Sequence, residues 1–256
     1  MKSGQNGINL PALKGVLSMS FDPYEFDRNY ASHQADTLGQ YTAKTFLWMV
    51  LGLLVTFGVA VGCWITNATL YAAYYFPYCH IVVLIATLVI SFTMVRRLEK
   101  MAVGTAIGLF VLFSALFGFT LSFYLLIYRL ASLTLCFLLT AVYFGALAAY
   151  GFFTKRDLSS LRTILVSGLL FLIIFGLLSM FIPGFQMFDR VVCLIGIAVF
   201  LGYTAYDTQK IRAFYHYYSA SPDMLAKASI FSALQLYLDF INLFLYLLRF
   251  LGSKKN

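Results

Sequence analysis

Asp239 lies in the middle of the last long apolar stretch of the chain, residues 230–251. An ionised carboxylate at that depth in hydrocarbon costs roughly 3 kcal/mol, so such a residue indicates a proton or ion site that has a partner. The other carboxylate at the boundary of a strongly apolar segment is Asp207, which follows residues 191–206. Two carboxylates that meet in a low dielectric cannot both ionise cheaply, so they share a proton and act as a pH sensor. Once deprotonated, the pair offers hard oxygen ligands for calcium.

A structural interpretation of the same two residues stays open. Asp207 could cap the end of a helix or pair with Lys210, while Asp239 is hydrogen-bonded and permanently protonated. The expected helix places Asp239 roughly 13 Å from the helix start. Contact with Asp207 therefore requires either that the preceding helix extends further or that the local membrane surface is indented.

The composition is that of a membrane protein. The 256 residues are 61% hydrophobic and only 11% charged, with a mean hydropathy of +0.85, whereas soluble domains carry about 25% charged residues. Most of the apolar stretches reach the roughly 17 to 25 residues that a membrane-spanning helix needs, and none shows the alternation of a membrane β-barrel. We therefore expect an all-α protein with seven spans, at residues 45–65, 80–95, 102–126, 132–153, 164–182, 191–206 and 230–251.

The expected organisation has a polar cytoplasmic tail at residues 1–44, a transmembrane domain at 45–252 and a short tail at 253–256. No apolar core follows a basic start, so we expect no cleaved signal peptide. Most Lys and Arg residues fall in the tail and in alternate loops, which predicts a cytoplasmic N-terminus. The last basic residues would then face outward if the final segment crosses fully, and a re-entrant final helix is the alternative.

Three spans on each side of the midpoint predict two three-helix layers, which permits an inverted repeat around a central last helix. The polar residues of that last helix fall within one narrow wedge at 100° per residue. Such a stripe cannot face lipid, so we expect it to line hydrogen-bonded contacts or a narrow aqueous path. Its members are Ser232, Gln235, Asp239, Asn242 and Tyr246.

Other residue classes give no specific chemistry. The four cysteines and three histidines lack metal-ligand spacing, and we assign them no role and no resident cofactor. The net charge of +8 is spread over short loops instead of forming a patch, which argues against nucleic acid and leaves the lipid bilayer as the partner. An intramembrane aspartyl protease is disfavoured because Asp239 lacks the Gly-x-Gly-Asp context of such enzymes, so we expect no enzymatic activity.

Two long blocks near the C-terminus resemble the Bax inhibitor family, also called transmembrane Bax inhibitor motif proteins, in their bacterial branch. The blocks are AYDTQKI at residues 205–211 and SALQLYLDFINLF at residues 232–244, followed by LLR at 247–249. The resemblance covers about residues 40 to 252. It implies two three-helix layers around a central last helix, in a bacterial inner membrane.

The resemblance also implies a pH-sensitive calcium leak governed by a di-aspartyl pair, which maps onto Asp207 and Asp239. Members of the family have a latch arginine at the cytoplasmic end of the second helix, and this position falls on Arg97 or Arg96, with Arg97 preferred. The alternative role for these two residues is contact with lipid phosphates. The alternative function is that of a non-transporting regulator of a membrane-anchored ATP-dependent protease or of stress survival. This chain lacks an acidic residue within its first five spans, unlike some family members.

Overall fold

The computed structural model describes residues 37–182 and 184–255, and within them the chain is helical. Every α-helix except the short α4 is long and apolar enough to cross a membrane, which confirms the prediction of seven spans. Short 3₁₀ turns precede α8 and α9. The α-helices are α3 (Leu38–Ile65), α4 (Ala68–Tyr75), α5 (Cys79–Arg97), α6 (Val103–Ile127), α7 (Leu130–Phe153), α8 (Arg162–Phe181), α9 (Asp189–Tyr218) and α10 (Pro222–Leu251).

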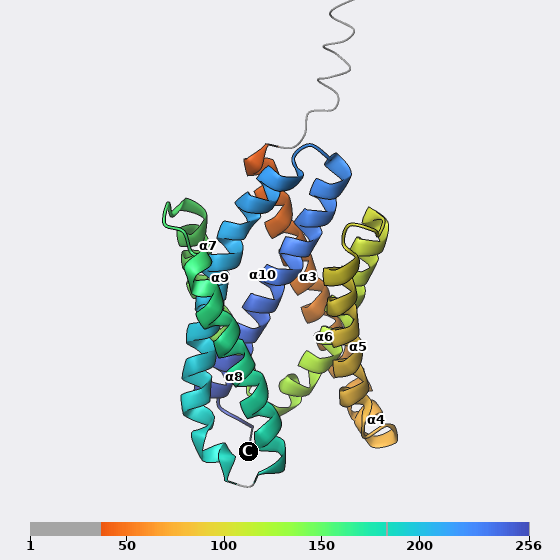
Figure 1. The fold of residues 1–256 in the computed structure, drawn as a ribbon. Coiled ribbons are helices and arrows are strands. Elements are labelled where there is room, and N and C mark those ends of the chain that lie inside the picture. Colours follow the sequence, from red (N-terminus) through yellow and green to blue (C-terminus); the bar gives the residue numbers. More distant parts are fainter. Residues whose placement is uncertain (1–36, 183, 256) are drawn as a thin grey trace, which may run out of the picture. The chain divides into compact units, whose positions relative to one another are not determined.

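The helices form two layers on either side of α10. In one layer α6 packs against α3 and α5, and in the other α9 packs against α7 and α8. The last helix contacts α9, α3, α7 and α6, and it crosses diagonally between the layers in Figure 1. It is also the most buried span, with 72% of its apolar window inside the protein. The predicted central position of the last helix is confirmed, whereas the inverted repeat is not established.

Three helices extend by more than one turn beyond the apolar stretches that marked them. Helix α3 begins at Leu38, where Thr37 and Gln40 form a capping box, so the end of the predicted polar tail is helical. The rest of that tail, residues 1–36, lies outside the described residues. Helix α9 continues past residue 206 to Tyr218. Helix α10 begins at Pro222 instead of residue 230, with the Ser221 side chain as its N-cap.

Small and hydroxylic side chains hold the layers close together. Gly151 of α7 lies against the backbone of Ala205 in α9, where a Cβ would overlap the Ala205 carbonyl oxygen. Between α3 and α10, the Thr56 hydroxyl is 2.7 Å from the Tyr237 hydroxyl, and both side chains are fully buried. Close backbone approach and hydroxyl hydrogen bonds are the usual means of packing membrane helices, because burial from lipid supplies no hydrophobic driving force.

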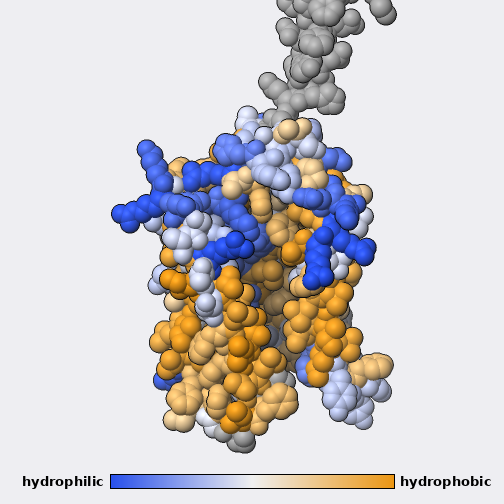
Figure 2. All heavy atoms as spheres, viewed as in Figure 1, coloured by the Kyte–Doolittle hydropathy of each residue, from blue (hydrophilic) through white to orange (hydrophobic). Residues whose placement is uncertain are grey.

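The two ends of the bundle differ in composition. We call the end that carries the α5–α6, α7–α8 and α9–α10 loops the basic end, and Figure 2 shows hydrophilic side chains gathered there above a broad hydrophobic band. The opposite end carries α4 and its neighbouring loop, with exposed Tyr71, Tyr74, Tyr75 and Tyr78. Tyrosines in this position are typical of a membrane–water interface.

The C-terminal segment, residues 252–255, is fastened to the turn between α6 and α7. The Arg129 amide donates to the Ser253 carbonyl at 3.1 Å, and the Lys255 amide donates to the Ile127 carbonyl at 2.8 Å. Tyr128 and Lys254 form an antiparallel bridge between these two hydrogen bonds. Since α10 begins at the basic end and finishes beside this turn, it spans the whole bundle and is not re-entrant.

Candidate functional site

The structure places Asp207 and Asp239 on two helices that pack against each other, both in the interior of the bundle. Asp207 lies within α9, about three turns before the end of that helix, and Asp239 lies near the middle of α10. Their exposed fractions are only 7% and 4%, and the charges of the two carboxylates are close enough to interact. The extension of α9 beyond residue 206 removes the offset that the sequence suggested, because Asp207 is not at a helix end.

The surroundings of the pair agree only in part with the structural interpretation of these residues. Asp207 caps no helix, since α9 continues well beyond it. The Lys210 ammonium lies over the rings of Phe214 and Tyr206, at 5.1 and 6.0 Å from their centroids, and forms no ion pair with Asp207 among the described residues. Asp239 Oδ2 is buried without a hydrogen-bond partner in this part of the chain. A buried, unsatisfied carboxylate oxygen is costly and is typical of a functional site.

Lys210 and Tyr203 are the groups of α9 that act electrostatically on the pair. The charge of Lys210 interacts with both carboxylates, and both carboxylates interact with the Tyr203 phenol. A nearby ammonium favours the ionised form of a carboxyl group, while burial and the second carboxylate oppose it. Burial, the second carboxylate and Lys210 are thus the influences that act on the two carboxyl groups.

The polar stripe of α10 is divided between two environments. Ser232 and Asp239 are buried, whereas Gln235, Asn242 and Tyr246 are half-buried. The Asn242 amide donates to the Leu238 carbonyl of its own helix at 2.8 Å, and the Tyr246 ring stacks on Phe200 of α9. Asn242 and Tyr246 are thus engaged in local contacts, whereas Ser232 Oγ, like Asp239 Oδ2, is buried without a hydrogen-bond partner among the described residues. The role of the stripe in an aqueous path stays a prediction.

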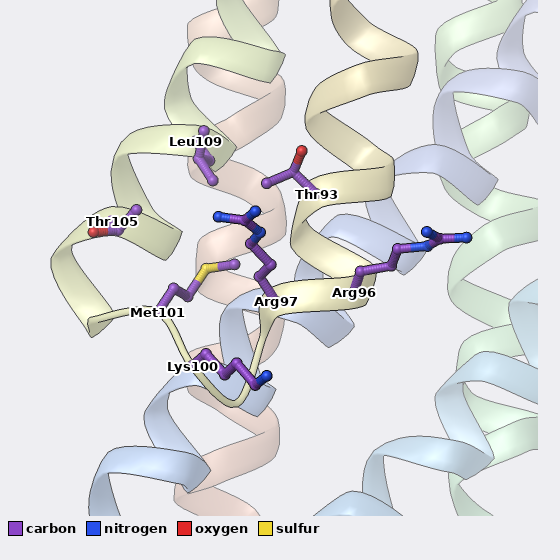
Figure 3. A pocket seen from close by; sticks show the side chains of 7 residues that line it. All are labelled: Thr93, Arg96, Arg97, Lys100, Met101, Thr105 and Leu109. Carbon is purple, nitrogen blue, oxygen red and sulfur yellow. The ribbon is translucent and has the colours of Figure 1, made fainter.

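Arg96 and Arg97 end α5 at the basic end, but the structure does not bring them to Asp207. Figure 3 shows the Arg97 guanidinium directed toward α6, between Thr93 and Leu109, and the Arg96 side chain directed to the other side of α5. The Arg96 guanidinium lies 4.4 Å from the centroid of the Phe92 ring. Neither arginine forms an ion pair within residues 37–182 and 184–255. The latch assignment therefore stays a prediction.

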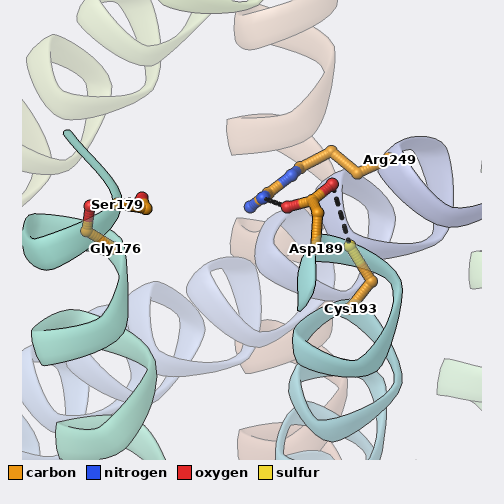
Figure 4. Close-up of polar contacts among 5 residues, drawn as sticks. All are labelled: Gly176, Ser179, Asp189, Cys193 and Arg249. Carbon is orange, nitrogen blue, oxygen red and sulfur yellow. Dashed lines mark hydrogen bonds and ion pairs between the residues drawn. The ribbon is translucent and has the colours of Figure 1, made fainter. Parts of the chain in front are cut away.

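A second polar cluster, which was not predicted from the sequence, lies at the opposite end. Arg249 near the end of α10 forms an ion pair with Asp189 at the start of α9, and Figure 4 shows the Cys193 thiol beside the same carboxylate. The Lys255 ammonium donates to the Leu125 carbonyl at 2.8 Å. The distribution of Lys and Arg along the chain predicted few basic residues at this end. The contacts of Arg249 and Lys255 explain how these two basic residues are accommodated there. Asp189 and Arg249 lie sixty residues apart in sequence, so no local sequence pattern predicts that they form an ion pair.

Lys227 is the other missed residue, and it is buried. The sequence placed it in a loop, but it lies in the second turn of α10 with only 6% of its surface exposed. Its ammonium donates to the Glu99 and Met101 carbonyls at 3.3 and 3.2 Å. Lys227 therefore fastens the start of α10 to the α5–α6 loop.

The described residues contain no group of three or more His, Cys, Asp or Glu side chains that could hold a metal ion. Asp207 and Asp239 are thus a two-carboxylate site. Calcium prefers six to eight oxygen ligands, so carbonyls, hydroxyls or water would have to supply the oxygens that the two carboxylates do not provide.

Comparison with known proteins agrees with the two sequence blocks that contain this pair. The family model described as "Inhibitor of apoptosis-promoting Bax1" matches residues 38–256, which include every transmembrane helix. The chain belongs to the Bax inhibitor family. This match confirms the resemblance drawn from residues 205–211 and 232–249.

Bacterial members of the Bax inhibitor family align with most of the chain. The inner membrane protein YbhL of Escherichia coli K12 is 37% identical over 219 residues, which cover 85% of this chain and 93% of YbhL. An uncharacterized protein of Rickettsia prowazekii is also 37% identical over 219 residues, with 86% and 92% covered. An uncharacterized protein of Borreliella burgdorferi is 35% identical over 223 residues, with 85% and 93% covered.

Proposed function

We propose that this Bax inhibitor family protein is a pH-sensitive calcium leak of a bacterial inner membrane, gated by Asp207 and Asp239. The observation that carries the proposal is the burial of two interacting carboxylates at the centre of the bundle, one of them with an unpartnered oxygen. A protein that only needed a stable helical core would place apolar side chains there, because buried charge is expensive in a membrane.

A site of two carboxylates suits a permeating ion better than a resident one. Ion conduction requires binding that is strong enough to admit the ion and weak enough to release it. High-affinity calcium sites gather more protein oxygens than this pair can supply. We therefore treat calcium as the transported ion and expect its occupancy of the pair to be brief.

Protonation provides the pH dependence. At acidic pH the pair keeps its shared proton and has little affinity for cations; as the pH rises the proton leaves and calcium can enter. We assign the described arrangement to a closed state, and the small exposure of both carboxylates supports that assignment. Opening would require a helix to move, and α5 is the candidate, because it packs mainly against α6 and carries Arg96 and Arg97.

The latch and the orientation complete the proposal. In one state Arg97, or its neighbour Arg96, would reach Asp207 and hold the two layers together at the basic end. We place that end and the N-terminus in the cytoplasm, since basic loops remain on that side. Calcium would then enter from the opposite end, where Asp189 and Arg249 form an ion pair.

The test is calcium flux into liposomes that contain the full chain, measured from about pH 5 to about pH 8. Wild-type protein is expected to conduct more at the alkaline end of this range. Asp207→Asn and Asp239→Asn should each abolish the difference between the two ends of the range, because the amide can neither release a proton nor supply a charged ligand.

The matched control is Asp157→Asn. Asp157 is an exposed carboxylate at the basic end, and hydrogen bonds from the Ser159 amide and hydroxyl lower its pKa below the usual value. It is therefore ionised throughout the assay range, and its loss should leave both flux and pH response unchanged. Equal pH responses of wild type, Asp207→Asn and Asp239→Asn would refute the di-aspartyl mechanism.

A further inference from the structure

A pocket of about 670 Å³ opens at the basic end between α5 and α6. It is lined by the end of α5, the following loop and the first turns of α6, and Figure 3 shows the side chains around it. Arg96, Arg97 and Lys100 all contribute to its wall, and all three are exposed. Their number and proximity distinguish this pocket from the apolar hollows elsewhere on the described surface.

The residues that line the pocket carry positive charge and no negative charge. Its lining contains no carboxylate, and none of its three cations forms an ion pair in the described part of the chain. The nearest acidic residue in sequence, Glu99, accepts a hydrogen bond from the Tyr218 hydroxyl. Lys227 adds a further buried cation behind the loop, where it binds the Glu99 and Met101 carbonyls. The site is thus strongly positive and suits an anion.

The N-terminus of α6 faces the same pocket and strengthens its positive character. Its N-cap residue, Ala102, supplies no side-chain hydrogen bond, and Thr105 in the first turn lines the pocket. The free amides and the dipole at a helix N-terminus favour negative groups, phosphate among them. This helix end adds to the three cations but would not define a site without them.

An apolar slot continues from the basic pocket along α5. The slot, about 530 Å³, shares Thr93, Arg96 and Arg97 with the pocket and is otherwise lined by Leu88, Val89 and Phe92. These three apolar side chains are 62%, 59% and 59% exposed, on a helix that is only 17% buried. A soluble anion would need the basic pocket alone, whereas a cationic head joined to an exposed apolar slot matches a phospholipid.

We infer that the basic pocket and the slot together bind one anionic phospholipid. Its headgroup phosphate lies among Arg97, Lys100 and the first turn of α6, and an acyl chain follows Leu88, Val89 and Phe92 toward the bilayer interior. Basic pockets between membrane helices on the cytoplasmic side are suited to such headgroups. The inference does not depend on calcium conduction, because it concerns binding at α5 and α6 and not the carboxylate pair.

The test is native mass spectrometry of the purified full chain with phosphatidylglycerol or phosphatidylcholine of matched acyl chains. Wild type should retain one phosphatidylglycerol in preference to phosphatidylcholine. A variant with three substitutions, Arg96→Gln, Arg97→Gln and Lys100→Gln, should lose at least about tenfold in phosphatidylglycerol affinity, since each cation near a membrane surface contributes about fivefold.

The matched control also removes three positive charges at the basic end, but from the region of the α7–α8 connection: Lys155→Gln, Arg156→Gln and Arg162→Gln. It should retain the lipid as wild type does. Arg97→Lys keeps the positive charge and should retain most of the phosphatidylglycerol affinity. The melting temperature of the triple variant shows whether it is folded.

Two results would overturn the inference. If both triple variants lose phosphatidylglycerol equally, the lipid responds to the overall charge of the basic end and not to this pocket. If inorganic phosphate displaces phosphatidylglycerol at equal concentration, the site binds a free anion and the slot contributes nothing. Retention by the control, loss by the pocket variant and failure of phosphate to compete would together support the inference.

Discussion

Lys227 gives the most direct test of how the start of α10 is held. Lys227→Met keeps the length of the side chain but removes the ammonium that donates to the Glu99 and Met101 carbonyls at 3.3 and 3.2 Å. Hydrogen bonds from a charged donor contribute about 1.5 to 3 kcal/mol each. Relief of the desolvation penalty of a buried cation, several kcal/mol, offsets much of that loss. We therefore expect a net destabilisation of about 1 to 3 kcal/mol.

Two measurements separate the local effect of Lys227→Met from the global one. The melting temperature in detergent should fall by about 2 to 4 °C for each kcal/mol lost. Amide hydrogen exchange should accelerate in residues 98–102, the loop that loses its anchor, more than in the α7–α8 loop. Lys227→Arg, which retains the charge and the donors, should recover part of the stability.

The reasoning would be refuted by a specific pattern. If Lys227→Met melts at or above the wild-type temperature and exchange in residues 98–102 is unchanged, the two hydrogen bonds do not hold the loop. The buried ammonium would then be a net cost to the fold, as some buried ion pairs are.

Three further predictions concern packing and pH. Tyr237→Phe removes the hydroxyl that contacts Thr56 and should cost about 0.6 kcal/mol, and at most about 1.7, in reversible unfolding from mixed micelles. Gly151→Val should cost about 1 to 3 kcal/mol by forcing α7 away from Ala205, and should reduce the yield of folded protein; an unchanged yield and melting temperature would contradict the close packing. The pKa of Asp157 is lower in the folded state than in the unfolded state, so the ionised carboxylate stabilises the fold above the unfolded-state pKa. That stabilisation is lost as the pH falls through the folded-state pKa. Asp157→Asn and wild type should therefore have the same melting temperature at strongly acidic pH and slightly different ones at neutral pH.

The number of spans could be predicted from the sequence because every membrane helix must be apolar over most of its length. Helix ends could not be predicted from hydropathy, since helices continue beyond the apolar segment. Some of the ends were nevertheless signalled: Thr37 and Gln40 have the spacing of a capping box, and Ser221 followed by Pro222 is a typical helix start. No comparable signal marks the extension of α9 to Tyr218.

The carboxylate pair was predictable in part for the same reason. A charged residue within an apolar stretch stands out, and so Asp239 and then Asp207 were identified from the sequence alone. Lys227 and the ion pair of Asp189 with Arg249 were not, because each depends on a contact between segments far apart in the chain. Whether an arginine of α5 reaches Asp207 depends on side-chain orientation and helix position, which spacing along the chain does not encode.

The fastening of residues 252–255 to the α6–α7 turn has a practical consequence for experiments. Two backbone hydrogen bonds and one bridge tie the segment after α10 to residues 127–129, so the end of the central helix and the turn between two outer helices move together. A reporter or affinity tag inserted directly after residue 255 would strain these hydrogen bonds, and a tag placed before α3 is the safer choice for topology and flux measurements.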